Sequence, residues 1–210
     1  MIIKDLTSYV FEMTTADMDG GVSGQGRPDL NFANIAKEKF AFLRDLGFAI
    51  IESLPTIVRY RKGDIQVDVY HGRRSYEIGL SVTWLDARYE LPDFIAVADS
   101  QAAKKFYTPM VSTREGVIAS LTRLSELAKR YSGQALQGDA EFFTEVAAKH
   151  KSLMEKYWLE MNARQLRPQA HEAFRLGKYR EAAELYKQIR PLLTPTEIKK
   201  LATAEERSKE

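Results

Sequence analysis

The sequence predicts an α+β protein, in which an N-terminal helix packs on an antiparallel β-meander and an all-helical C-terminal half ends in a helical hairpin. Three observations predict this fold. Apolar and polar residues alternate over residues 56–85, which is typical of strands with one buried face. Apolar residues recur at helical spacing just before this stretch, and again from residue 114 onward. Because a helix precedes the meander, it can cover the buried face of the sheet.

The composition of the 210-residue chain is that of a soluble globular protein, with 44% hydrophobic and 29% charged residues. A chain of this length can bury a core as one domain or as two small ones. The formal net charge of +2 gives little support for a general attraction to nucleic acid. The absence of cysteine excludes disulfide frameworks, thiol catalysis and thiolate metal sites, and it fits a reducing cytosol.

Membrane segments are not predicted. No apolar run approaches the roughly 20 residues that a membrane-spanning helix needs. The first residues, Met1 to Asp5, lack the basic start and apolar stretch of a signal peptide. We therefore expect a cytoplasmic protein with no membrane association.

Residues 1–28 are predicted to form a segment apart from the folded module. Residues 2–13 alternate weakly between apolar and polar types and fit either a strand or a short helix. Residues 14–28 are rich in glycine, but no Gly-Lys-Ser/Thr follows and the spacing does not fit the dinucleotide fingerprint. A flexible linker or loop is therefore favoured over a phosphate-binding loop.

Residues 29–90 are expected to form one α+β module that begins with a helix. Either Asp29 or Asn31 can cap this helix. Gly47 suits the left-handed position that follows the last helical turn. Residues 48–53 then form a short apolar strand that leads into the meander.

Two hairpins define the predicted meander, and their registers agree. A turn at Lys62-Gly63 and a turn centred between Arg73 and Arg74 both place apolar residues on one side of the sheet. The first turn pairs Tyr60 with Ile65 and Val58 with Val67, and the second pairs Val69 with Ile78, Val67 with Leu80, Ile65 with Val82 and His71 with Tyr76. The predicted buried face consists of Val58, Tyr60, Ile65, Val67, Val69, Ile78, Leu80, Val82 and Trp84.

The opposite, polar face of the sheet is the first candidate for function. By alternation it carries Arg59, Arg61, Gln66, Asp68, Tyr70, Glu77, Gly79, Ser81 and Thr83. A solvated face is typical of antiparallel sheets that are covered on one side only. The alternative is a recognition surface, because mixed charge, an exposed Tyr70 and a close-approach Gly79 suit a protein partner better than a small molecule. The candidate binding residues on this face are Arg59, Arg61, Asp68, Tyr70 and Glu77.

Residues 91–210 are predicted to form a helical module. Residues 86–92 interrupt the pattern before it, because Pro92 disfavours helix at the preceding residue. A weak helical pattern over residues 94–106 is followed by a strong one over residues 114–131.

A long helix is predicted after this strong one. Asp139 can cap it, and apolar residues recur at helical spacing as far as Met161. Pro168 suits the first turn of the next segment. Thr194-Pro195-Thr196-Glu197 opens a final helix with a capping box.

Residues 170–210 are predicted to contain a helical hairpin. Gly177 ends its first helix, Ala182 allows the second helix to approach closely, and Tyr179 and Tyr186 fill the seam. This pattern resembles a single repeat of the tetratricopeptide type. The resemblance implies one hairpin packed on the preceding helices, because such repeats build a superhelix only by stacking.

The hairpin departs from the repeat pattern at Ala173, where an aromatic residue is expected, and no second copy is present. The layout of the whole chain is similar to that of uncharacterised bacterial cytoplasmic proteins, some of which resemble immunity or accessory proteins of toxin systems. That resemblance implies a protein partner and assigns no functional residue.

The three histidines do not predict a metal site. His71 lies beside Arg73 and Arg74, and it is either a half-buried edge histidine or part of an anion-binding turn with the two arginines as bidentate donors. His150 lies on an apolar helix stripe, and His171 lies far along the chain. No His-x-x-x-His, Glu-x-x-His or Gly-x-Ser-x-Gly motif is present, so we expect neither a metal nor another cofactor.

The charge pattern favours a protein partner over nucleic acid. The basic residues concentrated on the sheet are Arg59, Arg61, Lys62, Arg73 and Arg74, and Asp68 and Glu77 interrupt them. We therefore expect a non-catalytic protein that binds a protein partner through the polar face or the helical tail. Anion binding by an enzyme-like domain at the turn 71–74 is the alternative, and nucleic-acid binding is the least favoured. The oligomeric state stays open.

Overall fold

The computed structural model describes residues 30–209 of the chain. The predicted N-terminal segment, with the strand-or-helix alternative at 2–13 and the glycine-rich loop at 14–28, lies outside the described residues. Contacts divide the chain into two compact units, with the boundary between Val146 and Ala147. The expected boundary at residue 90 falls within the first unit.

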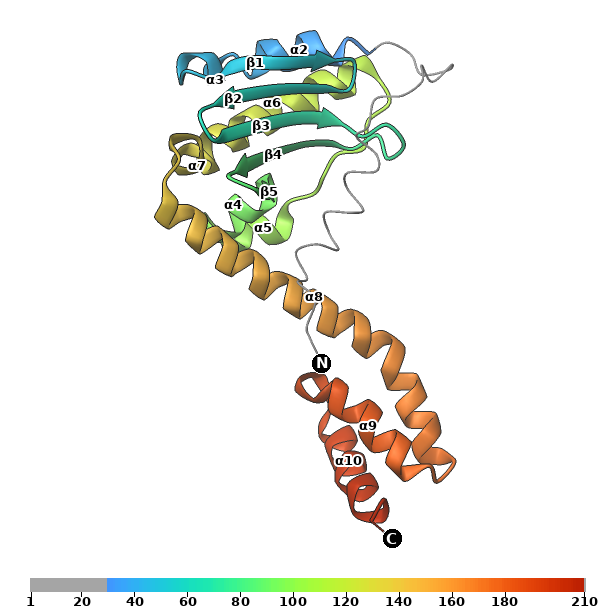
Figure 1. Cartoon of the computed structure of the whole chain (residues 1–210). Coiled ribbons are helices and arrows are strands. Elements are labelled where there is room, and N and C mark those ends of the chain that lie inside the picture. The colour runs from blue at the N-terminus through green and yellow to red at the C-terminus, as the bar shows by residue number, and fades with distance from the viewer. Residues whose placement is uncertain (1–29, 210) are drawn as a thin grey trace. The chain divides into compact units, whose positions relative to one another are not determined.

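The first unit is built on a five-stranded antiparallel sheet whose strands follow one another in chain order (Figure 1). The strands are β1 (Ala49–Leu54), β2 (Ile57–Lys62), β3 (Ile65–His71), β4 (Ile78–Trp84) and β5 (Ala87–Glu90). The predicted α+β class is confirmed. β5 is not among the predicted strands, because Leu85 and Asp86 form its turn without a glycine and Leu85 itself adopts a φ of +52°.

The predicted pairing of both hairpins is wrong by two residues. Val58 pairs with Val69 and Tyr60 with Val67, so the first turn is Gly63-Asp64 and not Lys62-Gly63. In the second hairpin the pairs are Val69 with Leu80, Val67 with Val82, Ile65 with Trp84 and His71 with Ile78. The second loop is longer than predicted, because Tyr76 adopts a φ of +57° and Glu77 forms an isolated bridge with Met110.

The predicted buried face survives this shift of register. Side chains of a strand alternate between faces with a period of two, so a shift of two residues moves no residue to the other face. Eight of the nine predicted residues are buried, and Trp84 is half-buried, with its ring stacked on Phe143 at 4.6 Å.

Helices cover the buried face and close one hydrophobic core. The helices of the first unit are α2 (Phe32–Lys39), α3 (Phe42–Asp45), α4 (Leu91–Ala98), α5 (Ser100–Lys105), α6 (Arg114–Tyr131) and α7 (Gly133–Gln137). α2, α6 and α4 contact the sheet (Figure 1). The expected break at 86–92 is wrong, because β5 and the start of α4 occupy most of it. α4 takes Pro92 into its first turn, where a missing N–H costs little.

The first predicted helix is interrupted, and Asn31 does not cap its start with a side-chain hydrogen bond as expected. Two short helices, α2 and α3, replace the single helix. The end is as predicted. Gly47 adopts a φ of +89°, and the Phe48 N–H donates to the carbonyl of Leu43 at 2.9 Å, which closes the last turn.

α8 (Ala140–Arg175) is longer than the predicted helix. Asp139 caps it as expected, since its Oδ1 accepts hydrogen bonds from the N–H groups of Glu141 at 3.0 Å and Phe142 at 3.1 Å. Pro168 lies inside the helix and does not begin a new one. The proline is exposed, so water can reach the helical carbonyl that loses its partner there.

The second unit ends in α9 (Tyr179–Gln188), a 3₁₀ turn (Arg190–Leu192) and α10 (Pro195–Arg207). α9 and α10 pack against each other. Small residues dominate the core that the end of α8 forms with these two helices, whose buried members are Ala170, Ala173, Ala182, Ala183, Tyr186, Leu201 and Ala204. The predicted capping box is confirmed, because Thr194 and Glu197 exchange hydrogen bonds at the start of α10.

Candidate functional site

A row of polar side chains crosses all five strands of the polar face. Neighbouring members are direct cross-strand partners, in the order Glu52, Arg59, Asp68, Ser81 and Glu90. We call this set the cross-strand row. Acidic and basic groups alternate along its first three members, and opposite charges on adjacent strands stabilise a sheet.

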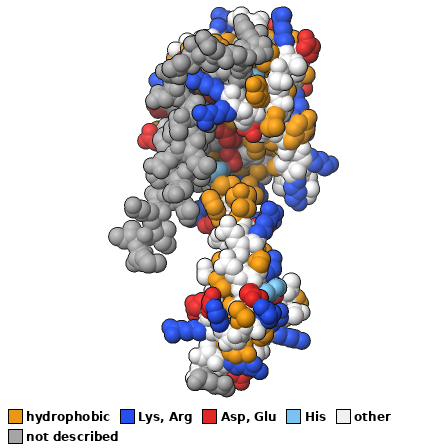
Figure 2. Space-filling model, turned by 90° about the vertical axis from the view of Figure 1, so that its right-hand side faces the viewer, with side chains coloured by type: hydrophobic (Ala, Val, Ile, Leu, Met, Phe, Trp, Pro, Cys, Tyr) orange, Lys and Arg blue, Asp and Glu red, His pale blue; other side chains and the backbone are white. Residues whose placement is uncertain are grey.

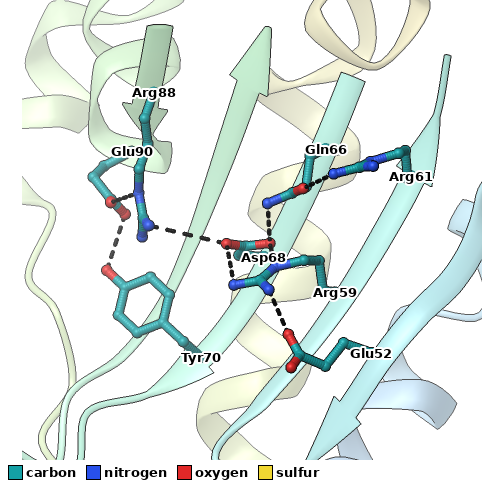
Figure 3. Close-up of polar contacts among 8 residues, drawn as sticks. All are labelled: Glu52, Arg59, Arg61, Gln66, Asp68, Tyr70, Arg88 and Glu90. Atoms are coloured by element: carbon teal, nitrogen blue, oxygen red, sulfur yellow. Dashed lines mark hydrogen bonds and ion pairs between the residues drawn. The ribbon is translucent and has the colours of Figure 1, made fainter. Parts of the chain in front are cut away.

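Arg59 joins the first three strands of the sheet (Figure 3). Its Nε donates to Asp68 Oδ1 at 2.9 Å, and its Nη1 donates to Glu52 Oε2. Burial alone would lower the pKa of Arg59, but the bonds to the two carboxylates outweigh burial and raise that pKa above its usual value. The guanidinium is therefore firmly charged, and its donors are committed to groups of the protein itself.

Asp68 is the most deeply buried charged group of the row, with 2% of its surface exposed. It also accepts a hydrogen bond from Gln66 Nε2 at 3.1 Å, and Arg88 Nη1 lies 3.9 Å from its Oδ2. A buried carboxylate is stable only when cations and donors compensate its charge. Arg59 and Arg88, from opposite sides, supply that compensation.

Tyr70 and Arg88 hold the other end of the row. The Tyr70 hydroxyl donates to Glu90 Oε2 at 2.9 Å, and Arg88 Nε donates to Oε1 of the same carboxylate at 3.1 Å. Burial, together with the charge of Glu90, raises the pKa of Tyr70 well above its usual range, so the hydroxyl stays a donor. Burial also raises the pKa of Glu90, although Arg88 and Tyr70 act against that shift.

The sequence suggests that Gly79 leaves room for a protein partner. In the structure it leaves room for the Tyr70 ring instead. The two residues are direct cross-strand neighbours. A Cβ added at Gly79 would lie 2.3 Å from Cζ of Tyr70, so the ring covers the glycine. A cavity of about 110 Å³ adjoins this contact and is lined in part by Tyr70, Glu90, Pro92 and Phe106.

The eight predicted binding residues divide into two groups. Arg59, Arg61, Asp68 and Tyr70 lie on the polar face, where the exposed Arg61 donates to Gln66 Oε1 at 2.7 Å. His71, Arg73, Arg74 and Glu77 lie at the end of β3 and in the β3–β4 loop. The structure therefore does not bring the eight residues together.

His71 is buried in the core of the first unit. Its Nε2 lies 2.8 Å from the carbonyl oxygen of Val111 and therefore donates its proton there, and its ring stacks on Phe32 with 5.6 Å between centroids. Arg73 and Arg74 are exposed. The imidazole is thus committed to the fold, and it does not share an open anion site with these arginines.

Three members of the site are missing from the sequence prediction, namely Glu52, Arg88 and Glu90. Glu52 is hidden in an apolar run, and the bulge at Ile51 changes its face relative to simple alternation. Arg88 and Glu90 lie in β5, which the sequence does not predict. The polar alternation of Arg88 and Glu90 with Ala87 and Tyr89 is the signal that could have found them.

The chemistry of the polar face is that of a balanced ionic surface. Its guanidinium groups are Arg59, Arg61 and Arg88, and its carboxylates are Glu52, Asp68 and Glu90. Within residues 30–209, no three His, Asp or Glu side chains are placed to hold a metal ion. In the same part of the chain, every helix is too short or too polar to span a membrane.

Arg59 is taken up by two carboxylates, and Lys62 lies over the ring of Phe48 at 5.6 Å. Of the basic residues that the sequence places on the sheet, Arg59 therefore has its charge compensated within the cross-strand row.

Comparison with family models, with curated proteins and with solved structures finds no match for this chain.

Proposed function

We propose that this protein is a non-catalytic interaction protein that binds a protein partner through the polar face of its sheet, as an immunity or accessory factor would. The observation that carries the proposal is the cross-strand row, in which Arg59 and Arg88 hold Asp68 between them and fix Glu52 and Glu90 at the two ends. Groups of both signs are thereby held at fixed positions across the sheet.

Such an arrangement favours recognition of a partner with complementary charges. Side chains that are already ordered lose little conformational entropy on binding, and charge complementarity supplies specificity and a fast encounter. Basic and acidic side chains are also interspersed on the surface that Figure 2 shows. A balanced surface of this kind suits a folded protein better than a polyanion, which needs basic groups with free donors.

Apolar residues at the sheet edge supply the other component of an interface. Leu54 is exposed and pairs with Ile57 on the polar side of the sheet, two residues along β1 from Glu52 of the row. Ile50 and Ile51 are also exposed along β1. Protein interfaces combine an apolar centre with a polar rim, and β1 with the cross-strand row offers both.

Site-specific photo-crosslinking tests the proposal. A photoreactive amino acid replaces the exposed Arg61 on the polar face, and in a control chain it replaces Glu126, which is exposed on α6 at the opposite face of the sheet. In cells that express the chain from its own locus, we expect one adduct of defined mass from position 61 and none from position 126. Mass spectrometry then identifies the partner. Adducts of equal yield from both positions, or none from either, would overturn the proposal.

A further inference from the structure

The middle of α8 carries an apolar stripe that neither hydrophobic core uses. Its members recur at helical spacing and are Leu153, Met154, Tyr157, Trp158 and Met161. Leu153, Tyr157 and Trp158 are 39%, 51% and 43% exposed. Exposed apolar surface of this kind, grouped on one face, marks an interaction site more often than a solvated helix.

We propose that this stripe binds the same stripe of a second copy of the chain, so that two α8 helices pack antiparallel around a two-fold axis. The proposal concerns a surface distinct from the polar face and does not rest on the function proposed above. Its occupant follows from the order of residues along the helix.

The sequence around the midpoint between Glu155 and Lys156 is self-complementary when it is read in opposite directions. In an antiparallel pair centred there, Met154 lies level with Tyr157 of the second copy, and Leu153 lies level with Trp158 of the second copy. Apolar residues thus face apolar residues at each level. A two-fold axis repeats every contact, as an isologous interface requires.

Charged residues beside the stripe support the same arrangement. Lys149 and Glu160 are eleven residues apart, which places them within about 20° of each other around an α-helix and therefore on one flank of the stripe. Like flanks meet in an antiparallel two-fold pair, so Lys149 approaches Glu160 of the second copy, offset by roughly 3 Å along the axis. Neither side chain forms an ion pair with another residue of the described chain.

A parallel pair would lose these contacts. A parallel two-fold pair brings opposite flanks of the two helices together, so the flank that carries Lys149 and Glu160 in one copy would not meet the same flank of the other. The contact between Lys149 and Glu160 is therefore made only in the antiparallel arrangement, and it favours a second copy over an apolar helix that lacks these charges.

The mass of the full chain in solution tests the association. Sedimentation equilibrium is expected to give twice the chain mass of 23.9 kDa at micromolar concentration. Trp158→Glu is expected to give the monomer mass, while Ile198→Glu, at an even more exposed apolar residue of α10, leaves the dimer intact. Circular dichroism confirms that each variant is folded. A monomer throughout the concentration range, or a dimer that is unchanged by Trp158→Glu, would overturn the proposal.

Charge exchange and cross-linking test the orientation. Lys149→Glu and Glu160→Lys are each expected to raise the dissociation constant of the dimer by at least about fivefold, in line with charge-pair couplings at interfaces. The double exchange is expected to restore it. The chain has no cysteine, so Lys149→Cys and Glu160→Cys give single reactive sites. A short bis-maleimide should link the two variants only when they are mixed. Linkage of either variant to itself would contradict the antiparallel pair.

Discussion

At the scale of single residues, the polar face depends on one buried charge. The carboxylate of Asp68 receives hydrogen bonds from Arg59 and Gln66, and Arg88 lies within 3.9 Å. Both guanidiniums are mostly covered, so each of them also needs the carboxylate. Removing one partner of a buried network costs more than the network itself contributes, because the remaining groups stay desolvated.

Asp68→Ala therefore tests whether the row is a single network. We expect the free energy of unfolding to fall by about 1–3 kcal/mol, the usual cost of leaving buried polar partners unsatisfied. Urea denaturation followed by circular dichroism measures the change. Arg61→Ala, at an exposed position outside the row, is the control and should change stability by less than about 0.5 kcal/mol. Equal effects of the two substitutions would show that the row contributes no more than a solvated surface.

Gly79→Ala tests the close approach of the Tyr70 ring. The new methyl group would lie within 2.3 Å of the ring, so the ring must move and its bond to Glu90 must break. We expect a loss of about 1–3 kcal/mol, as for other overpacked sites. Denaturation midpoints measure it.

Two variants control for the loss of glycine itself. In a Tyr70→Ala background the same Gly79→Ala change should cost much less, because the two sites are coupled through one contact. Gly133→Ala in α7 has open space around its new methyl group and should be neutral or slightly stabilising. An equal cost of Gly79→Ala with and without the tyrosine ring would contradict the geometry.

At the scale of elements, Glu197 connects the start of α10 to α8. It accepts from Arg167 Nε at 2.9 Å, lies 3.0 Å from His171 Nε2 and completes the capping box with Thr194. Burial alone would raise the pKa of Glu197, but the hydrogen bonds from Thr194, the charge of Arg167 and the bond to His171 outweigh burial and lower that pKa below its ordinary 4.5.

The pH dependence of the second unit follows from this lowered pKa. A carboxyl with a lower pKa in the folded state stabilises fully above about pH 4.5 and loses that contribution as the pH falls through the folded-state pKa. Glu197→Gln keeps a capping side chain but removes the charge. We expect it to lower the thermal midpoint at pH 7, and the difference from the parent chain to shrink below pH 4.5. Glu206→Gln, exposed on the same helix, is the control. A difference that stays constant with pH would refute the assignment.

Pro168 makes α8 less stable than its length suggests. Proline removes one backbone hydrogen bond inside a helix, and it is about 3 kcal/mol less favourable there than alanine. Pro168→Ala should therefore stabilise the second unit by about 1–3 kcal/mol in urea denaturation. Pro195→Ala, at the first position of α10, should bring no gain, because proline is favoured at that position. Stabilisation by both changes would show that position in the helix does not matter.

Some of these elements could be predicted from the sequence, and others could not. The face of each strand follows from alternation, so the buried set Val58 to Val82 is correct even though the pairing is shifted by two residues. The shift itself depends on turn conformations at Gly63-Asp64 and Tyr76, and alternation carries no information about them. β5 and the continuation of α8 through Pro168 depend on tertiary contacts that override local signals.

At the scale of the whole molecule, the candidate site is a property of the sheet and not of any segment. Arg59, Asp68 and Tyr70 follow from the sequence because they alternate with a clear apolar set. Glu52 and Glu90 do not, because their place in the row requires the register of all five strands. His71 shows the opposite case, since its neighbours in sequence suggest a site while its burial commits it to the core.

The affinity of the identified partner tests the central proposal most directly. Isothermal titration calorimetry compares the parent chain with Arg61→Glu on the polar face and with Glu126→Lys on α6. We predict that Arg61→Glu weakens binding by about tenfold or more, equivalent to about 1.4 kcal/mol, and that Glu126→Lys leaves the dissociation constant unchanged. Equal affinities of all three chains would contradict binding through the polar face.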